Sequence, residues 1–362
     1  MLSVKTPRAK RLNRLAQAAL ASGDLATASR TAQRSLALLP VQPKSFRGTA
    51  DRANMLLTLA YIVGEQAGHN QSAEYVQSAV QLMLRFPVGP ERDIWLAELL
   101  TRLGTSLRLA GRFAEASSVL TSARALDCWD RLEPLRRAAT LNALGILAKD
   151  TGRYGEAAEF YAQSQAILEG DPEIDRRQLA ALHHNIAGLV HAQRLYVEAE
   201  PEIRSALAIR RGIESADCVA VAADLSVLGA VLNGQGRLGE AEEALLTARG
   251  IWEARYGEEH YEVAVQLNNL GSIQQKRSDF DGAAASYHQA LHIKERVLGS
   301  HHPEIAALLN NIADLESDQG QVSDARIHYA EALSIFRQTL GHEHPSTRTC
   351  AVSLSRLASS TV

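Results

Sequence analysis

Aromatic residues are scarce in this chain. Trp, Tyr and Phe make up 5% of its 362 residues, although hydrophobic residues as a whole make up 46%. Sheets usually draw their cores from β-branched and aromatic residues, whereas a core of Ala and Leu favours helices that pack closely through small side chains. The composition therefore predicts an all-α protein that is long enough to bury a large core.

Cysteine is also rare, and its positions form no motif. Cys128, Cys218 and Cys350 are far apart in the sequence and belong to no CxxC pair. A disulfide framework and a cysteine-based zinc site are therefore not expected. A reducing, cytoplasmic compartment is the simplest location for such a chain.

Long apolar runs are missing as well. No stretch reaches the eighteen or so apolar residues that a bilayer-spanning helix needs, so we expect no membrane span. The first residues resemble a signal peptide, because basic residues precede an Ala/Leu segment. Asn13, Arg14 and Gln17 interrupt that segment, which favours an amphipathic helix over a signal sequence.

Acidic residues are almost absent from the first fifty positions. This stretch has nine Lys or Arg and one acid, Asp24, although the whole chain has a net charge of −3. Such a basic end suits an acidic partner, a nucleic acid or a membrane surface, or it is simply a solvated helix face. Nucleic acid is not expected, because no aromatic residues are interleaved for base stacking and the rest of the chain is acidic.

An internal repeat dominates the rest of the sequence. The segments 267–291 and 309–333 share a paired Asn, a small residue, a polar turn and an Ala-rich helix, at an offset of 42 residues. A small residue that begins the second helix of each unit recurs every 41 to 45 residues, at Ala28, Ala73, Ala116, Ala157, Ala199, Ala241, Ala283 and Ala325. This spacing predicts one structural unit used eight times.

Two further positions repeat within each unit. The turn lies five residues before each alanine, and six of these eight positions are Gly, which predicts a positive φ just after a helix. The turn positions are Gly23, Gly68, Gly111, Gly152, Arg194, Gly236, Ser278 and Gly320. Twelve residues before the alanine there is a small residue, such as Gly104, Gly229 or Gly271. We expect it to face the alanine across a close helix pair. In the second unit Tyr61 falls at this position, beside Ala60.

The joints between units also repeat. Gly257, Gly299 and Gly341 should end long helices, while Pro303 and Pro345 suit the first turn of the next one. A last helix from about residue 345 has no partner and should cap the array. We therefore divide the chain into two irregular, basic units at 1–86, six regular units at 87–345, and a capping helix with a tail at 346–362.

The pattern L-N-N-L-G…G-x-x-x-x-A-x-x-x-Y-x-x-A-L resembles the tetratricopeptide repeat (TPR). Its 42-residue form is similar to the repeats of kinesin light chains and of bacterial repeat arrays. The resemblance implies a right-handed α-solenoid of about eight extended helix pairs plus a C-terminal capping helix. Proteins of this kind are generally non-catalytic, and they hold peptide segments or partner domains on the concave face.

Asparagine is disfavoured inside a helix by roughly half a kcal/mol relative to Ala, so its recurrence needs a reason. Its amide suits the backbone of an extended peptide, since it offers both donors and an acceptor. Equally, the amides could bond neighbouring helices and bind nothing. The resemblance places the candidate residues on the inner curve, with Arg102 and Lys276 added for their charge; the others are Asn142, His184, Asn185, Ser226, Asn268, Asn269, Asn310 and Asn311.

Catalytic and metal-binding patterns do not stand out. Eight of the twelve histidines lie between His260 and His344, and the i,i+4 pair His288 and His292 has a spacing that can hold a metal. His260, His302 and His344 are themselves 42 residues apart, so the repeat accounts for them. No phosphate-binding loop or nucleophile elbow is found. We expect no catalytic residue, no metal site and no cofactor.

The sequence therefore predicts a non-enzymatic scaffold that binds a peptide segment or a partner protein. A second hypothesis is a peptide-sensing regulator that changes conformation to control an enzyme or a transcription factor. The proline-rich joints at 40–43 and 87–90 are its candidate flexing points. A histidine-based enzyme is a third. The sequence does not predict the oligomeric state or the partner's identity.

Overall fold

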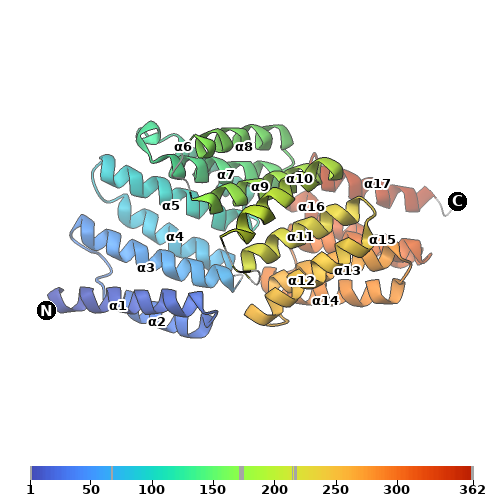
Figure 1. Ribbon diagram of the computed structural model, residues 1–362, viewed down its shortest axis with the longest axis horizontal. Coiled ribbons are helices and arrows are strands. Elements are labelled where there is room, and N and C mark those ends of the chain that lie inside the picture. Colours follow the sequence, from blue (N-terminus) through green and yellow to red (C-terminus); the bar gives the residue numbers. More distant parts are fainter. Residues whose placement is uncertain (1, 67, 171–174, 214, 216–217, 360–362) are drawn as a thin grey trace. The chain divides into compact units, whose positions relative to one another are not determined.

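The computed structural model describes residues 2–66, 68–170, 175–213, 215 and 218–359. In these residues it has seventeen α-helices, one short 3-10 helix and no strand. Contacts divide the chain into two compact units, Met1–Leu147 and Ala148–Val362, called unit 1 and unit 2 below. Successive hairpins lie side by side within each unit (Figure 1). The first sixteen helices follow one another as eight helix–turn–helix pairs, which confirms the predicted repeat array.

The helices of unit 1 form its first three hairpins and begin a fourth. Helix α7 runs across the division between the two units. The bounds are α1 (Leu2–Ala21), α2 (Leu25–Ala37), α3 (Phe46–Glu65), α4 (His69–Met83), α5 (Pro90–Leu109), α6 (Phe113–Arg124), the 3-10 helix η1 (Trp129–Arg131) and α7 (Pro134–Asp150).

Unit 2 continues the same pattern to the last helix. No helix in the described part of either unit is long and apolar enough to cross a membrane. The bounds are α8 (Tyr154–Glu169), α9 (Arg176–Ala192), α10 (Tyr196–Arg211), α11 (Val219–Gly234), α12 (Leu238–Tyr256), α13 (Tyr261–Lys276), α14 (Phe280–Leu298), α15 (Pro303–Asp318), α16 (Val322–Thr339) and α17 (Pro345–Ser359).

The turns inside the hairpins have the predicted backbone conformation at seven of the eight positions. Their φ values are positive even where the residue is not Gly, as at Arg194 (62°) and Ser278 (61°). The second hairpin was predicted wrongly. Gly68 has a φ of −75° and donates its N–H to the Val63 carbonyl. In the third hairpin the equivalent bond is made by Arg112, the residue that follows the turn glycine. Gly68 therefore lies one residue after the turn position.

This shift of one residue moves the whole second hairpin in register. Its small inner residue is Ala60, which is buried, and the predicted position, Tyr61, is exposed. The small residue near the start of its second helix is therefore Ser72, which is buried and comes one residue before Ala73. The irregular spacing of the first units reflects this shift.

Glycines inside the first helices allow close packing, as predicted, but their neighbour is a different residue. A Cβ on Gly271 would lie 2.7 Å from the ring of Tyr287, and one on Gly229 would lie 2.6 Å from the side chain of Leu245. These neighbours come four residues after the small residue that was expected to face the glycine. The large side chain fills the space because the glycine leaves it open.

The joints between hairpins start helices through histidine caps. The Nδ1 atoms of His260, His302 and His344 accept hydrogen bonds from the backbone N–H two residues later, at 3.1 to 3.3 Å. Helices α15 and α17 begin at Pro303 and Pro345, as predicted. The 42-residue spacing of these histidines therefore has a structural cause, the capping of α13, α15 and α17.

Helix α17 covers the last hairpin. Cys350 is fully buried, and Leu354 and Leu357 pack with it against the core of α15 and α16. Residues 360–362 of the predicted tail lie outside the described residues. The division at 86/87 and 345/346 rests on the regularity of the repeats and stays a prediction.

Candidate functional site

The first helices of four hairpins in unit 2 lie next to one another and carry most of the predicted site residues. Helix α11 contacts both α9 and α13, and α13 contacts α15. Polar side chains follow one another across these helices and are half-buried where they meet. We call this set the first-helix face: the polar side chains of α9, α11, α13 and α15.

Both polar atoms of the Asn268 side chain, on α13, bond to neighbouring amides. Its Oδ1 accepts from Asn311 Nδ2 of α15 at 2.9 Å, and its Nδ2 lies 3.4 Å from Asn269 Oδ1. These bonds join two repeats, so the structural interpretation of the asparagines holds at this position. Neither polar atom of the Asn268 side chain is therefore without a partner.

The other three asparagines on α13 and α15 keep hydrogen-bonding capacity. Asn310 donates to Asp314 at 3.0 Å, which leaves its Oδ1 without a partner in the described residues. Asn311 Oδ1 and Asn269 Nδ2 have none there either. All three side chains are half-buried, and one donor atom, Asn269 Nδ2, and two acceptor atoms, Oδ1 of Asn310 and of Asn311, have no partner in the described residues.

Asp314 fixes the C-terminal end of this group. It accepts from Asn310 and from the hydroxyl of Tyr329 on α16. Burial raises the pKa of Asp314 and outweighs the opposing effect of the Tyr329 hydrogen bond. The Asp314 carboxylate therefore fixes the orientation of the Asn310 amide. The sequence analysis did not identify Asp314 as part of the site.

His184 on α9 is held by a buried carboxylate. Its Nδ1 lies 2.8 Å from Asp224 Oδ1 on α11, and Arg210 donates to the other oxygen of Asp224 at 2.7 Å. Asp224 is fully buried. The signal that could have found it is a lone acid in an otherwise apolar helix. Ser226, also on α11, is buried and donates to the Ala222 carbonyl at 2.8 Å.

Lys276 has a structural contact with the preceding repeat. Its Nζ donates to the carbonyl and to the side-chain oxygen of Asn233 at 2.7 and 2.8 Å, and Asn233 in turn donates to Ser272 at 3.1 Å. Burial lowers the pKa of Lys276. The ammonium group therefore adds a second donor to the Asn233 carbonyl at the C-terminal end of α11, which also accepts from the Gly236 N–H at 3.1 Å.

The remaining predicted residues divide between the two units. Asn185, on α9 in unit 2, is half-buried, as is Asn142 on α7 in unit 1, and neither side chain is without a partner. Arg102, on α5 in unit 1, is exposed and lines a cavity of about 310 Å³ together with Tyr61 and Leu57. The structure thus brings together the residues of α13 and α15 within unit 2, whereas Arg102 and Asn142 belong to unit 1.

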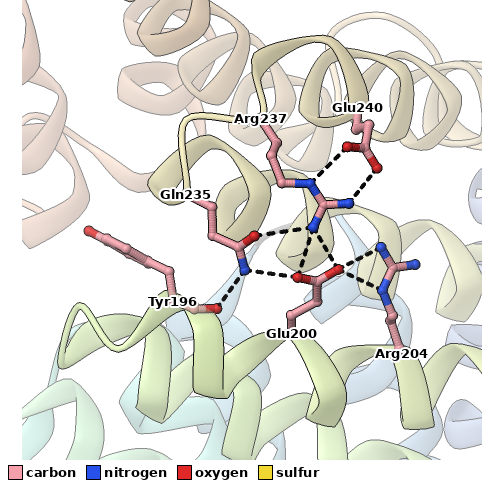
Figure 2. Close-up of polar contacts among 6 residues, drawn as sticks. All are labelled: Tyr196, Glu200, Arg204, Gln235, Arg237 and Glu240. Atoms are coloured by element: carbon pink, nitrogen blue, oxygen red, sulfur yellow. Dashed lines mark hydrogen bonds and ion pairs between the residues drawn. The ribbon is translucent and has the colours of Figure 1, made fainter.

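A separate polar cluster ties the fifth hairpin to the sixth (Figure 2). Glu200 on α10 accepts from Gln235 at 2.9 Å and from Arg237 at 2.9 Å, while Arg204 reaches it from the same helix at 2.7 Å. The Gln235 hydrogen bond, followed by those from the two guanidinium groups, lowers the pKa of Glu200 to about 2. Because these groups satisfy one another, we assign the cluster to repeat stacking.

The histidines do not gather into a metal centre in the described residues. No group of three or more His, Cys, Asp or Glu side chains there is placed to hold an ion. His288 and His292 lie exposed on α14.

Comparison with known proteins finds a family model that matches the C-terminal part of the chain. The tetratricopeptide repeat family model matches residues 220–296, 262–338 and 304–361. Residues 220–361 are therefore similar to tetratricopeptide repeats. No curated protein matches it in sequence.

Solved structures of TPR-like solenoids share its fold. A Rap protein complexed with competence and sporulation factor has a TM-score of 0.62 at 14% identity, covering 99% of this chain and 98% of that one. NprR in complex with its cognate peptide NprX has a TM-score of 0.61 at 14% identity, covering 87% of this chain and 83% of that one. TPR-like repeats of a putative kinesin light chain from Podosopora anserina match with a lower TM-score of 0.41, which does not bear on the fold, at 21% identity and covering 57% of this chain and 98% of that one.

Proposed function

We propose that this chain is a non-enzymatic adaptor that binds an extended peptide segment of a partner protein on the first-helix face of unit 2. The observation that carries the proposal is the set of unused amide groups on α13 and α15. Asn269 supplies a donor, and Asn310 and Asn311 supply acceptors, without a partner in the described residues. An extended peptide backbone presents the complementary groups at every residue.

The similar folds support the same proposal. The Rap and NprR structures hold, respectively, competence and sporulation factor and a cognate peptide. They share the helical solenoid with this chain at low sequence identity. The amide groups of this chain are thus carried on a fold that takes such ligands in other proteins.

The remaining amide groups limit how strongly the face binds. Three hydrogen bonds at ~1 kcal/mol each give about 3 kcal/mol, and the loss of translational and rotational freedom on association removes much of that. Affinity and sequence preference must therefore come from side chains around the amides. His184, which Asp224 orients, is one such polar side chain on α9.

Two single substitutions test the proposal, one expected to affect peptide binding and the other expected to affect stability. Asn269→Ala removes the unpartnered Nδ2 donor together with the Oδ1 that accepts the long 3.4 Å bond from Asn268, so it should weaken binding of a selected peptide and lower the melting temperature only slightly. Asn268→Ala removes the bond to Asn311 and should mainly lower the melting temperature. Affinity would be measured by fluorescence anisotropy, with peptides selected from a random library. Equal affinities of wild type and Asn269→Ala would argue against binding at this face.

A second candidate function is regulation by conformational change. It is favoured by the contact of Pro345, at the start of α17, with Gly152 in the turn between α7 and α8. This contact ties the first turn of unit 2 to its last helix, so a peptide that altered the stacking of α9 to α15 would strain it. Identical X-ray scattering profiles with and without bound peptide would exclude this function.

A cytoplasmic location belongs to the same proposal. Cys128 and Cys350 are buried free thiols, and Cys218 is a half-buried one. Free thiols are typical of proteins in reducing compartments. Fractionation of the native cell would test it.

A further inference from the structure

Two joints between hairpins in unit 1 expose apolar side chains to solvent. In the joint between α2 and α3 the side chain of Val41 is 71% exposed, and in the joint between α4 and α5 those of Leu84 and Val88 are 49% and 74% exposed. A single exposed apolar residue is ordinary, but a group of them marks a surface that another molecule covers. None of the three belongs to the first-helix face, so this surface is independent of the proposed function.

The two joints lie against each other. The ring of Phe46, at the start of α3, meets the ring of Phe86 in the α4/α5 joint edge to face, with centroids 5.6 Å apart. Helices α3 and α5 both begin at the same end of unit 1 (Figure 1). The exposed residues of the two joints therefore share one surface. We call it the joint edge: Val41, Lys44, Arg47, Leu84, Arg85 and Val88.

Arginines of the helices that follow hold both joints in place. Arg52 of α3 donates to the carbonyl of Leu39 at 3.2 Å, and Arg92 of α5 donates to the carbonyl of Phe86 at 3.2 Å. Both joints also contain prolines, which restrict the backbone further. Because the exposed tips are carried on a fixed backbone, little conformational entropy is lost when a partner covers them.

The charge of the joint edge is positive. Lys44, Arg47 and Arg85 are exposed, and none of them has an ion pair with any described residue. The two joints and the first turns of α3 and α5 contain one exposed acid, Glu91. The sign changes at the next joint, 125–133, where three acids are exposed. The joint edge is therefore a basic, partly aliphatic surface that ends within unit 1.

We propose that the joint edge of unit 1 binds the surface of a bilayer that contains anionic lipids. Its three basic side chains lie among the headgroups, and its three aliphatic side chains enter the boundary with the acyl chains. Binding of this kind grows with the buried apolar area and with the attraction to anionic lipids, and the joint edge supplies both. The protein then lies on the bilayer and does not cross it.

A nucleic acid fits this surface less well. Aliphatic tips have no role on a phosphate backbone, and base stacking needs an accessible ring. Phe46 and Phe86 are half-buried against each other, so neither presents a free face at the joint edge.

The probe is a pair of vesicle preparations that sediment together with bound full-length protein. One is phosphatidylcholine alone, and the other is phosphatidylcholine with an equal amount of phosphatidylserine. The variants are Arg85→Gln and Val88→Ser, each checked for an intact fold by circular dichroism. The matched controls are Arg326→Gln and Val197→Ser. Both control residues lie on second helices of unit 2, where Arg326 is exposed and Val197 is 72% exposed.

Wild type should bind the vesicles that contain phosphatidylserine and not the others, and added salt should weaken the binding through screening. Arg85→Gln should lower the partition coefficient about fivefold, and Val88→Ser should lower it about threefold to tenfold. The two controls should change little. Asn269→Ala in unit 2 should bind the vesicles as wild type does, even if the proposed function fails.

Four results would each overturn the inference. They are no binding to the anionic vesicles, equal losses in a variant and its control, an unchanged partition coefficient for Val88→Ser, and tighter binding to soluble polyglutamate than to the vesicles. The third would mean adsorption by charge alone, and the fourth would assign the joint edge to an acidic protein.

Discussion

Gly152 and Pro345 lie in contact. A Cβ on Gly152 would come within 2.6 Å of Cδ of Pro345 and 3.2 Å of Cδ2 of His344. The turn between α7 and α8 therefore packs directly on the joint that starts α17. Both residues belong to unit 2, so this contact joins its first turn to its last helix.

Substitution of Gly152 should lower the free energy of unfolding more than substitution of the turn glycine of another hairpin. Gly152 and Gly236 have nearly the same φ, 75° and 78°, but nothing lies within 4 Å of a Cβ on Gly236. Both changes to Ala should cost about 1 kcal/mol of backbone strain, and Gly152→Ala should cost a further 1–3 kcal/mol of overpacking. Urea unfolding measures both. Equal losses would mean that the contact with Pro345 adds nothing to stability.

Two glycines inside helices should respond to Ala in opposite directions. A Cβ on Gly271 would meet the ring of Tyr287 at 2.7 Å, whereas a Cβ on Gly250 has open space around it. Gly271→Ala should destabilise the protein by about 1–3 kcal/mol through overpacking. Gly250→Ala should stabilise it by about 0.5–1 kcal/mol, because Ala is the better helix former. Thermal melts of the two variants check this, and a stabilising Gly271→Ala would show that the hairpin is not closely packed there.

The Glu200 cluster should make stability depend on pH in the acid range. The folded-state pKa of Glu200 is about 2, below the value of about 4.3 for an unperturbed Glu. The unfolded chain therefore binds the proton more readily, so the contribution of Glu200 is complete above pH 4.3 and is lost as the pH falls toward 2. Because solvent screens the cluster, we expect about 1 kcal/mol.

The change Glu200→Gln isolates this effect. The variant should be less stable than wild type at pH 7, and the difference should shrink by pH 3, as measured by urea unfolding at the two pH values. A difference that stays constant between pH 7 and pH 3 would contradict the role of the charge.

The cap at His344 should weaken in mildly acidic solution. Burial lowers the pKa of His344, despite the raising effect of the Asp150 backbone, and its Nδ1 must be unprotonated to accept from Ser346. Since the unfolded chain takes up the proton first, the contribution is complete above pH 6.5 and is lost as the pH falls below that.

Asn is also a good N-cap, so His344→Asn should keep the cap without its pH dependence. Between pH 7.5 and 5.5 the wild type should lose more stability than the variant, by up to about 1 kcal/mol. Thermal melts at the two pH values measure this. Parallel losses in both proteins would rule out His344 as the titrating group.

The repeat could be predicted from the sequence because nearly every hairpin has the same backbone conformation at its turn. Positive φ at Arg194 and Ser278 followed from spacing alone, although neither residue favours it. The second hairpin was misplaced because Ala73, next to the true position Ser72, is also small and buried, so residue type could not choose between them. Neighbours such as Leu245 and Tyr287 depend on how two helix surfaces interlock, which a single sequence pattern does not show.

The candidate site was predicted only in part. Spacing placed Asn268, Asn269, Asn310 and Asn311 on adjacent helices, but it could not tell which amides are used between repeats. Which amides bond between repeats depends on side-chain rotamers and on contacts between residues 43 positions apart, such as Asn268 and Asn311. The buried Asp224 behind His184 was missed because a periodic pattern of amides does not reveal a single charged residue.

A crystal structure of the full chain with a library-selected peptide tests the central claim most directly. The account predicts that the peptide lies extended along α13 and α15, with its backbone hydrogen-bonded to Asn269 Nδ2 and to the Oδ1 atoms of Asn310 and Asn311. A peptide bound on the second helices, or one that leaves these three amides without contacts, would contradict it.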